Sequence, residues 1–437
     1  DPLWSRGLGD VYKRQVLYLH ATANALPLAN ACLTVLRGPI CLTIRSPRGC
    51  NKARAHSHII PRYHIRFFVS TRELWPLGMD DEASASRPPL ALSLELVSSF
   101  KPAKVFKDFV QPDCRVTSLD YDDRGELCVT ASDDETIQLY NCRSGKHIKT
   151  LYSKKYGVHL ARFTHRSSAI VYASTKEDDT VRYHSLHDNK YLQYFRGHKR
   201  RVTSLAMSPV DDTFLSAAVD DSVRLWDLRT PAAQGNMRIQ GHPIVAYDPS
   251  GLVFGIALNE RSSILLYDIR KFDQNPFITI TIDDTAALSQ IMMPPRIPVL
   301  THLSFSHTGQ YILAGTSGDV HYIADTYTGK VVYRLTGHIG LERADGASVG
   351  LVPKAGISGQ EMCWTPDGRM VIAGSAAGQV HVWALPEHPP ATLPATLHST
   401  TTLQGQEGTP SVVAFNPRCA HMCTAGAQVA FWLPDLP

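Results

Sequence analysis

Short apolar runs separated by polar turn signals recur along the chain, and the clearest set lies between residues 202 and 227. There the sequence VTSLAMSPVDDTFLSAAVDDSVRLWD is divided by Ser208-Pro209-Val210-Asp211-Asp212 and by Asp220-Asp221-Ser222 into three short runs. The runs are rich in apolar, β-branched and small side chains, as strands are, and Pro, Asp and Ser favour tight turns. The pattern predicts a meander of three antiparallel strands.

Two dipeptides flank this meander. Gly197-His198 stands just ahead of the first run, and Trp226-Asp227 ends the last one. Gly-His ahead and Trp-Asp behind, at this distance, indicate one blade of a WD-repeat β-propeller. One blade cannot bury both of its faces, so the unit has to recur until a ring closes.

The unit recurs seven times. The positions equivalent to the strand end at Trp226 are Tyr140, His184, Trp226, Tyr267, Ala324, Trp383 and Trp432. Successive positions are 44, 42, 41, 57, 59 and 49 residues apart, against about 40–45 for an uninterrupted repeat. We therefore predict an all-β fold, a seven-bladed WD40 β-propeller over residues 100–437. The longer spacings predict surface insertions at 283–299, 339–356 and 386–409.

The seventh unit lacks an outer strand of its own, because only five residues follow Trp432. Every other unit has such a segment. We expect Val105, Phe106 and their neighbours in KPAKVFKDFV (101–110) to supply it, joining the two ends of the ring and removing a bare sheet edge. The alternative is that this stretch is a disordered tail.

Residues 1–78 differ in composition from the rest. They hold eleven Lys or Arg and three Asp or Glu, and the first methionine is Met79. A transit or secretory peptide fits poorly, because polar residues interrupt the apolar stretch at 16–36 and a targeting peptide begins at a start methionine. We interpret 1–78 as a non-native or disordered leader, from upstream translation or cloning, and 79–99 as a polar N-terminal tail.

Charge and missing motifs exclude several classes of function. The chain has a net charge of +4, but residues 79–437 alone sum to −4, so we expect no direct sequence-specific nucleic-acid partner. The sequence contains no long apolar run, so it predicts no membrane-spanning segment. There is no P-loop, HExxH, GxSxG or pair of CxxC motifs, and Cys419-Ala-His-Met-Cys423 is at most half of a metal site. We expect a binding protein, not an enzyme, with no cofactor and no metal.

Three aspartates and one fuller set of polar residues occupy equivalent blade positions. Asp134, Asp178 and Asp220 each precede their strand end by six residues, in a turn where a carboxylate can accept bonds from turn amides and from a buried histidine. In the third unit the predicted structural network is His198, Ser216, Asp220 and Trp226. A Ser/His/Asp group also occurs in hydrolase active sites. The tryptophan beside it favours the interpretation that these residues form a buried network of hydrogen bonds.

Two neighbouring loops are basic. Ser153-Lys154-Lys155-Tyr156-Gly157 enters the second unit and His198-Lys199-Arg200-Arg201 enters the third. Loops from an outer strand to the next inner strand gather on one face of a propeller. We predict a partner-binding surface for a phosphorylated or acidic peptide, in which Lys154, Lys155, Lys199, Arg200 and Arg201 bind the anion and Tyr156 offers a flat contact. The alternative is a pair of solvated loops.

Five segments carry a more specific resemblance. They are LYSKKYGV (151–158), SLHDNKY (185–191), MSPVDDTF (207–214), RLWDLR (224–229) and AFWLP (430–434). Over about residues 100–434 the chain resembles the WD repeat-containing protein 82 family, whose yeast member is Swd-two. The leader and the enlarged loops of the last three blades depart from that family.

The resemblance implies a nuclear, non-enzymatic adaptor. It implies Set1-type methyltransferase subunits as partners, in the COMPASS complex that methylates lysine four of histone H3. It also implies links to cleavage and polyadenylation factor, to protein phosphatase 1 in transcription termination, and to the phosphorylated tail of RNA polymerase II. The alternative is a generic scaffold or a substrate-recruiting subunit of a ubiquitin ligase.

Overall fold

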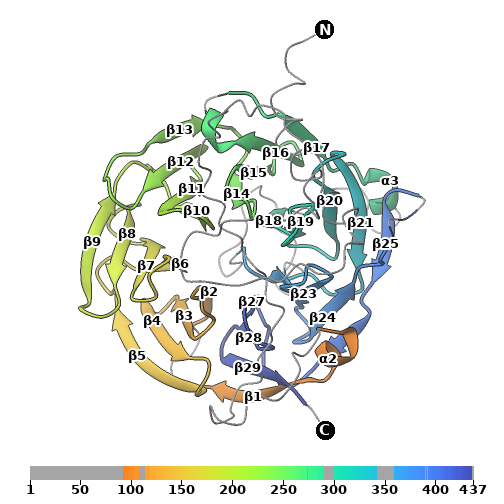
Figure 1. Cartoon of the computed structure of the whole chain (residues 1–437), viewed down its shortest axis with the longest axis horizontal. Coiled ribbons are helices and arrows are strands. Elements are labelled where there is room, and N and C mark those ends of the chain that lie inside the picture. Colours follow the sequence, from red (N-terminus) through yellow and green to blue (C-terminus); the bar gives the residue numbers. More distant parts are fainter. Residues whose placement is uncertain are drawn as a thin grey trace, which may run out of the picture. The chain divides into compact units, whose positions relative to one another are not determined.

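The computed structural model describes residues 92–107, 114–272, 274–289, 299–341, 359–388, 390 and 392–435. These residues lie within one compact unit, Val69–Pro437. They form seven sheets arranged as a ring, with β2, β6, β10, β14, β18, β22 and β27 innermost (Figure 1). The predicted seven-bladed propeller is confirmed.

Blades 1 to 3 follow the predicted order without insertions. Blade 1 contains β2 (Val116–Tyr121), β3 (Leu127–Ser132), β4 (Thr136–Asn141) and β5 (Lys146–Tyr152). Blade 2 contains β6 (His159–Phe163), β7 (Ala169–Ala173), β8 (Val181–Ser185) and β9 (Lys190–Phe195). Blade 3 contains β10 (Val202–Met207), β11 (Thr213–Ala218), β12 (Ser222–Asp227) and β13 (Gly235–Arg238).

Blades 4 to 7 complete the ring. Blade 4 contains β14 (Pro243–Tyr247), β15 (Val253–Leu258), β16 (Ser263–Asp268) and β17 (Ile278–Thr281), with a short 3-10 helix at Ile269–Lys271. Blade 5 contains β18 (Leu300–Phe305), β19 (Tyr311–Thr316), β20 (His321–Asp325) and β21 (Lys330–Thr336). Blade 6 contains β22 (Met362–Trp364), β23 (Met370–Gly374), β24 (Val380–Ala384) and β26 (Thr401–Leu403). Blade 7 contains β27 (Val412–Phe415), β28 (Met422–Ala425) and β29 (Val429–Pro434).

The N-terminal strand closes blade 7, as predicted. β1 (Phe100–Phe106) pairs antiparallel with β29, with Val105 opposite Ala430 and Phe106 opposite Val429. The Phe106 ring lies 4.7 Å from the ring of Tyr140 in blade 1 and 5.2 Å from that of Phe431 in blade 7, measured between centroids. Segments from the two ends of the ring therefore share one sheet and one aromatic cluster.

One insertion is more ordered than we expected. Residues 386–409 were expected to be a surface loop, but they contain β26 and a further strand, β25 (Ala395–His398). β25 pairs parallel with β21, so the sheet of blade 5 has five strands. The insertion at 283–299 begins with a helical turn, α3 (Thr285–Leu288), and most of the insertion at 339–356 lies outside the described residues.

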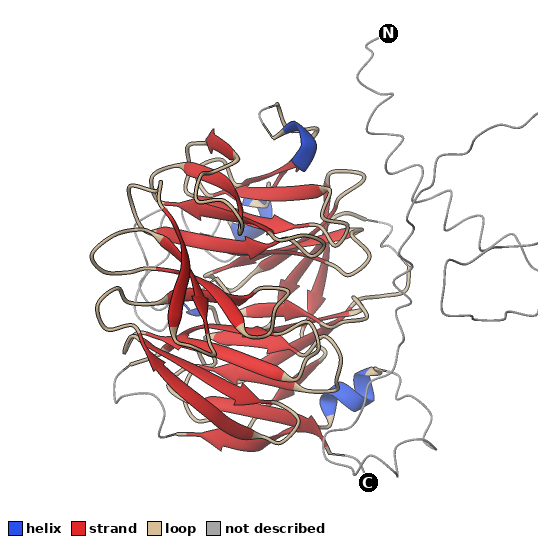
Figure 2. Ribbon diagram, turned by 60° about the vertical axis from the view of Figure 1, so that its left-hand side comes forward, coloured by secondary structure: helices blue, strands red, loops and turns tan. Residues whose placement is uncertain are grey.

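The hydrophobic core is divided into clusters between neighbouring blades. Between blades 2 and 3, Phe195 of β9 packs on Phe214 and Trp226, with ring centroids 4.9 Å and 5.5 Å apart. Each fully buried side chain of this size contributes about 1.5–3 kcal/mol. Seen from the side, the strands run between two faces made of loops (Figure 2). Because apolar packing fixes the strands, the loops on each face can vary in sequence.

A short helix precedes the ring within the expected tail 79–99. α2 (Leu94–Ser98) is capped by Ser93, whose hydroxyl accepts a hydrogen bond from the Leu96 N–H, and Leu96 and Val97 are buried. Residues 1–91 lie outside the described part of the chain, so the predicted leader and most of the tail stay predictions. No helix among the described residues is long and apolar enough to cross a membrane.

Candidate partner-binding surface

The four residues of the network predicted in blade 3 are brought together. The Trp226 N–H donates to the Ser216 hydroxyl at 2.8 Å, and Ser216 lies 2.6 Å from His198 Nε2. His198 Nδ1 is 2.9 Å from the Ser222 hydroxyl, which donates to Asp220 at 2.5 Å. Every partner is satisfied if the histidine is neutral with its proton on Nδ1. The result is one directional chain of hydrogen bonds from Trp226 to Asp220.

Burial decides between a structural network and a catalytic one. Ser216 and Trp226 are fully buried, so no substrate can reach the serine. Burial lowers the pKa of His198 to about 4, although the negative charge of Asp220 acts to raise it. Burial alone would raise the pKa of Asp220, but hydrogen bonds from Ser222 and from the Lys199 N–H lower it. Asp220 thereby anchors the start of the second basic loop.

The other two turn aspartates have different partners. Asp134 accepts hydrogen bonds from the backbone N–H and the hydroxyl of Thr136. Asp178 accepts from the Thr180 N–H and binds the guanidinium of Arg182 through both oxygens, at 2.9 Å and 3.0 Å. The histidine contact expected from the pattern is made by Asp220, whose carboxylate lies 3.5 Å from His198 Nδ1.

A related series of hydrogen bonds occurs in blade 7, where a glutamine takes the place of the histidine. Trp432 donates to the Thr424 hydroxyl at 2.7 Å, and Thr424 donates to Gln406. Gln406 follows Gly405, in the place of the Gly-His pair. The amide can accept and donate as a neutral imidazole does.

The first basic loop is held by its flanking residues. Gly157 has φ of +69°, a left-handed conformation that glycine adopts without strain, and it closes the turn that begins at Ser153. Ser153 is buried and contacts the hydroxyl of Tyr172 at 3.0 Å. Lys154 and Lys155 are exposed, and each ammonium lies over a tyrosine: 5.5 Å from the ring centre of Tyr152 and 5.2 Å from that of Tyr156.

Tyr156 differs from the flat contact we expected it to offer a partner. The guanidinium of Arg182 lies 3.7 Å from the centre of the Tyr156 ring, and Tyr191 meets that ring edge-on at 5.8 Å. Tyr194 contributes a further contact to Arg182 at 5.4 Å. Arg182 is only 2% exposed. We define Tyr156, Arg182, Tyr191 and Tyr194 as the tyrosine–arginine cluster of blade 2.

The sequence pattern does not predict this cluster. Tyr156 and Tyr191 belong to the separate segments LYSKKYGV and SLHDNKY. Arg182, between them in sequence, stands in a strand and gave no signal of its own. The two segments thus have a common structural role, since both position tyrosines around one buried cation.

The second basic loop adjoins the first. Lys199, Arg200 and Arg201 are exposed, and the Arg201 guanidinium reaches His159 of blade 2 at 3.5 Å. Burial, followed by the charges of Arg201 and Arg162, lowers the pKa of His159 to about 3. Within the described residues, the side chains of Lys199 and Arg200 have no hydrogen bond or ion pair. They are the two predicted cations most available to a partner.

Carboxylates limit how far the cationic surface extends. The loop between β7 and β8 carries Lys176, which pairs with Glu135 of blade 1. Burial raises the pKa of the Asp133 carboxyl in blade 1, and the nearby positive charge of Arg201 acts to lower it. Acidic turns therefore border the two basic loops.

The innermost strands hold titratable groups that sequence reasoning did not place together. Burial raises the pKa of Asp120 to about 6 despite the nearby Arg162, and Asp120 accepts a hydrogen bond from the Phe163 N–H at 2.7 Å. Arg162 donates to the backbone oxygens of Leu205 and Leu119, each at 3.3 Å. The hydrogen bonds of Asp120 and Arg162 therefore connect neighbouring blades, which is a structural role and not a catalytic one.

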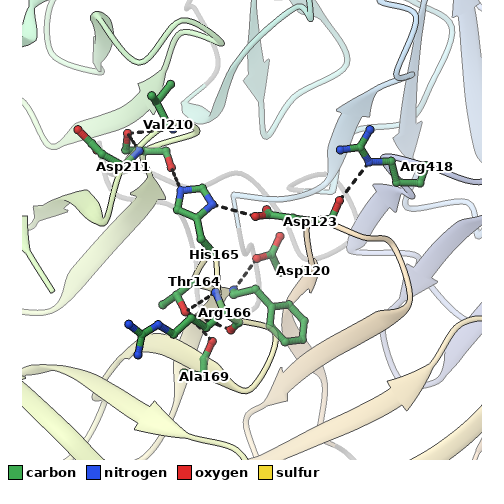
Figure 3. A network of polar contacts seen from close by, with 11 residues as sticks. Asp120, Asp123, Thr164, His165, Arg166, Ala169, Val210, Asp211 and Arg418 are labelled. Atoms are coloured by element: carbon green, nitrogen blue, oxygen red, sulfur yellow. Dashed lines mark hydrogen bonds and ion pairs between the residues drawn. The ribbon is translucent and has the colours of Figure 1, made fainter. Parts of the chain in front are cut away.

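His165 lies on the loop between β6 and β7 of blade 2 and contacts residues of blades 1 and 3 (Figure 3). Its Nδ1 lies 2.8 Å from the Asp123 carboxylate of blade 1, and its Nε2 lies 3.0 Å from the Ser208 carbonyl of blade 3. Both partners are acceptors, so both contacts are made by the imidazolium. Partial burial lowers the pKa of His165, but the bond to Asp123 outweighs it, and the pKa is raised. Arg418 of blade 7 donates to the Asp123 backbone oxygen at 3.1 Å.

The cysteine-rich segment of blade 7 packs into the core. His421 contacts the Tyr121 hydroxyl through Nδ1 at 3.0 Å, and burial lowers its pKa to about 3. Cys423 is fully buried, and burial raises the pKa of its thiol. Among the described residues, no group of three or more His, Cys, Asp or Glu is arranged to hold a metal.

Comparison with known proteins decides the family. The WD domain, G-beta repeat model matches residues 101–141, 189–227 and 358–384. The chain is 36% identical to Set1 complex component swd2 of Schizosaccharomyces pombe over 373 residues, covering 78% of this chain and 99% of that protein. It is 38% identical to WD repeat-containing protein 82 of Drosophila melanogaster, over 78% of this chain and 96% of the relative. The chain belongs to the WD repeat-containing protein 82 family.

A yeast member of the WD repeat-containing protein 82 family extends the comparison. COMPASS component SWD2 of Saccharomyces cerevisiae is 35% identical, over 80% of this chain and 98% of its own length. The resemblance inferred from five short segments is confirmed.

Proposed function

We propose that this chain is a non-catalytic adaptor subunit of a Set1-type histone methyltransferase complex. The observation that carries the proposal is the extent of similarity: relatives named Set1 complex component and COMPASS component are matched over 99% and 98% of their lengths. Similarity over a whole ring favours shared assembly, because a propeller binds partners through surfaces spread around its blades. The fold alone would not carry this inference.

The buried polar groups support a binding role over an enzymatic one. The Ser216–His198–Asp220 set lies inside a blade, and Asp120 and Arg162 bond neighbouring blades. The lysines and arginines of the two basic loops, by contrast, are exposed. We place an acidic or phosphorylated partner segment there, with Lys199 and Arg200 as its main contacts and Lys154, Lys155 and Arg201 at its sides.

In this proposal the tyrosine–arginine cluster positions the first loop. Tyr156 is held by Arg182 and Tyr191, so it fixes the lysines before it instead of offering its face to the partner. We further propose that the protein acts in the nucleus. Cleavage and polyadenylation factor, protein phosphatase 1 and the phosphorylated RNA polymerase II tail are finer partner proposals for the same surface.

Affinity purification of the full chain from nuclear extract, followed by mass spectrometry, tests the proposal. We expect Set1-type methyltransferase subunits to co-purify in comparable amounts with the bait. Recovery of ubiquitin ligase subunits without any methyltransferase subunit would contradict it. Recovery of cleavage-factor or phosphatase subunits in addition would support the finer partner proposals.

A further inference from the structure

The outer strands of the blades differ in how their free edges are protected. β13 and β17 have four residues each and β26 has three. β21 is covered by β25, and β1 contains Pro102 together with exposed lysines. Natural sheets protect edges by short length, proline, charge or cover, because an open edge pairs with other chains. β5 and β9 are longer and lack proline and cover, although each contains lysine and a β-bulge, at Ile148 and at Leu192.

β5 has seven residues and β9 has six, and neither contains proline. Within the described residues, no strand pairs with the outer side of β9. Figure 1 places the two strands next to each other at the perimeter of blades 1 and 2. Length and lack of cover therefore leave β9 open to strand addition, since β21 also has a register shift and still pairs with β25.

Exposed apolar side chains gather on the same two strands. Eight large apolar side chains are exposed among the described residues, and four of them lie on β5 and β9. These are Ile148 (50% exposed), Tyr152 (62%), Leu192 (50%) and Tyr194 (38%). Single exposed apolar residues are ordinary, but a concentration on neighbouring elements indicates an interaction surface.

Cations outnumber carboxylates around these apolar residues, although Asp188 in the turn before β9 interacts with Lys190 and Lys149. The exposed residues of β9 alternate as Lys190, Leu192 and Tyr194, and exposed Arg196 follows the strand. β5 contributes two lysines, and neither strand contains Asp or Glu. Such a surface complements a segment that combines apolar side chains with carboxylates.

The chain itself provides a precedent for strand addition at its perimeter. β25 lies parallel to β21, with Tyr333 opposite Ala395 and Thr336 opposite His398. β25 has only four residues and comes from the insertion before the next blade's outer strand. The outer edge of a blade can therefore accept an extended segment without disturbing the four strands inside it.

We propose that the outer edge of β9 binds an extended, acidic segment of a partner protein, which adds to blade 2 as a fifth strand. Backbone hydrogen bonds supply the pairing, and the side chains select the sequence. Apolar residues of the partner pack on Leu192 and Tyr194, and its carboxylates face Lys190 and Arg196. The site shares Tyr194 with the tyrosine–arginine cluster but uses none of the lysines and arginines of the cationic loops.

Selection of random dodecapeptides by phage display on the full-length protein tests this site. We expect enriched peptides rich in Asp or Glu with apolar residues at alternate positions. Binding of the enriched peptides should weaken on the order of tenfold in Leu192→Asp and in Lys190→Glu/Arg196→Glu. Val210→Asp is the matched control, because Val210 is 65% exposed on a loop of blade 3. That control should bind as the unchanged protein does, and the selection is repeated on Lys199→Glu/Arg200→Glu so that peptides taken by the cationic loops are not enriched.

Hydrogen exchange of the protein with and without the enriched peptide locates the contact, and we expect slowed exchange in β9. Three results would overturn the proposal. The first is no acidic enrichment, and the second is equal binding by Leu192→Asp and the unchanged protein. The third is a homodimer that Leu192→Asp dissociates, which would mean that a second copy of the chain, not a partner segment, occupies the edge.

Discussion

The guanidinium of Arg182 lies 3.7 Å from the centre of the Tyr156 ring, and the same side chain binds Asp178 through a nitrogen 2.9 Å from Oδ1. A buried charge is stable only when it is paired and hydrogen-bonded. Here the carboxylate supplies the pair, and three tyrosine rings supply the remaining surroundings. Blade 2 therefore places the SKKYG turn by means of a cation that solvent does not reach.

Replacing Arg182 tests that arrangement. Arg182→Ala should destabilise the protein by about 1.5–3 kcal/mol, because it removes a buried side chain that packs on tyrosine rings and bonds the Asp178 carboxylate, which is 38% exposed. Arg182→Lys should also destabilise it, since an ammonium cannot stack as a planar guanidinium does. Urea unfolding measures both changes.

Arg196→Ala is the control for the Arg182 variants. Its guanidinium lies 5.7 Å from the Tyr194 ring centre but is exposed, so its loss should cost less than about 1 kcal/mol. Equal costs for the buried and the exposed arginine would show that the cluster does not stabilise blade 2.

The His198 network predicts a specific dependence on acid. Because the folded pKa of about 4 lies below the unfolded value, the neutral histidine stabilises the fold fully above about pH 6.5 and less as the pH falls toward 4. His198→Gln copies the arrangement of blade 7 and does not titrate. The difference in unfolding free energy between the unchanged protein and His198→Gln should fall by about 2 kcal/mol from pH 7 to pH 5. A difference independent of pH would contradict a neutral, buried His198.

Glu361 predicts the opposite trend. It is 2% exposed between blades 5 and 6, accepts a hydrogen bond from Thr301, and burial raises its pKa to about 7. A raised folded pKa stabilises the protein at acidic pH, and that contribution is lost as the pH rises through 7. Glu361→Gln should be close to neutral at pH 5 and should stabilise the protein by about 2–3 kcal/mol at pH 8. Thermal unfolding at the two pH values measures this, and a loss of stability at pH 8 would count against it.

Ring closure depends on Phe106 more than on the ion pair beside β1. Phe106→Ala removes a buried ring from the seam between blades 7 and 1 and should cost about 3–5 kcal/mol. Lys101→Ala breaks only the exposed pair with Asp435 and should cost less than about 1 kcal/mol. If both variants unfold at the same urea concentration, the closing strand does not hold the ring.

Much of the ring could be predicted because WD repeats combine strand periodicity with fixed residues at fixed spacing. Trp226, Asp220 and His198 are within one repeat of each other, so their contact follows from the local pattern. The closing strand was predictable for a different reason, since a missing outer strand in blade 7 left one unpaired segment at the other end.

The remaining features depend on contacts that leave little local signal. β25 lies in a segment rich in proline and threonine, and its partner β21 belongs to the preceding blade. Arg334 binds Asp284 from a position 50 residues away, which ties the insertion at 283–299 to blade 5. Arg182 likewise has the sequence context of an ordinary strand residue, and only the folded blade brings Tyr156 and Tyr191 around it.

The most direct test of the adaptor proposal is quantitative co-purification with reversed charge on the second basic loop. Lys199→Glu/Arg200→Glu should leave the thermal unfolding temperature unchanged and should reduce recovery of Set1-type methyltransferase subunits on the order of tenfold or more. Arg270→Glu/Lys271→Glu makes the same change in charge at two exposed cations of blade 4 and should recover those subunits as the unchanged protein does. Equal recovery by both double variants would contradict partner binding through the cationic loops, and the absence of methyltransferase subunits from every sample would contradict the adaptor function itself.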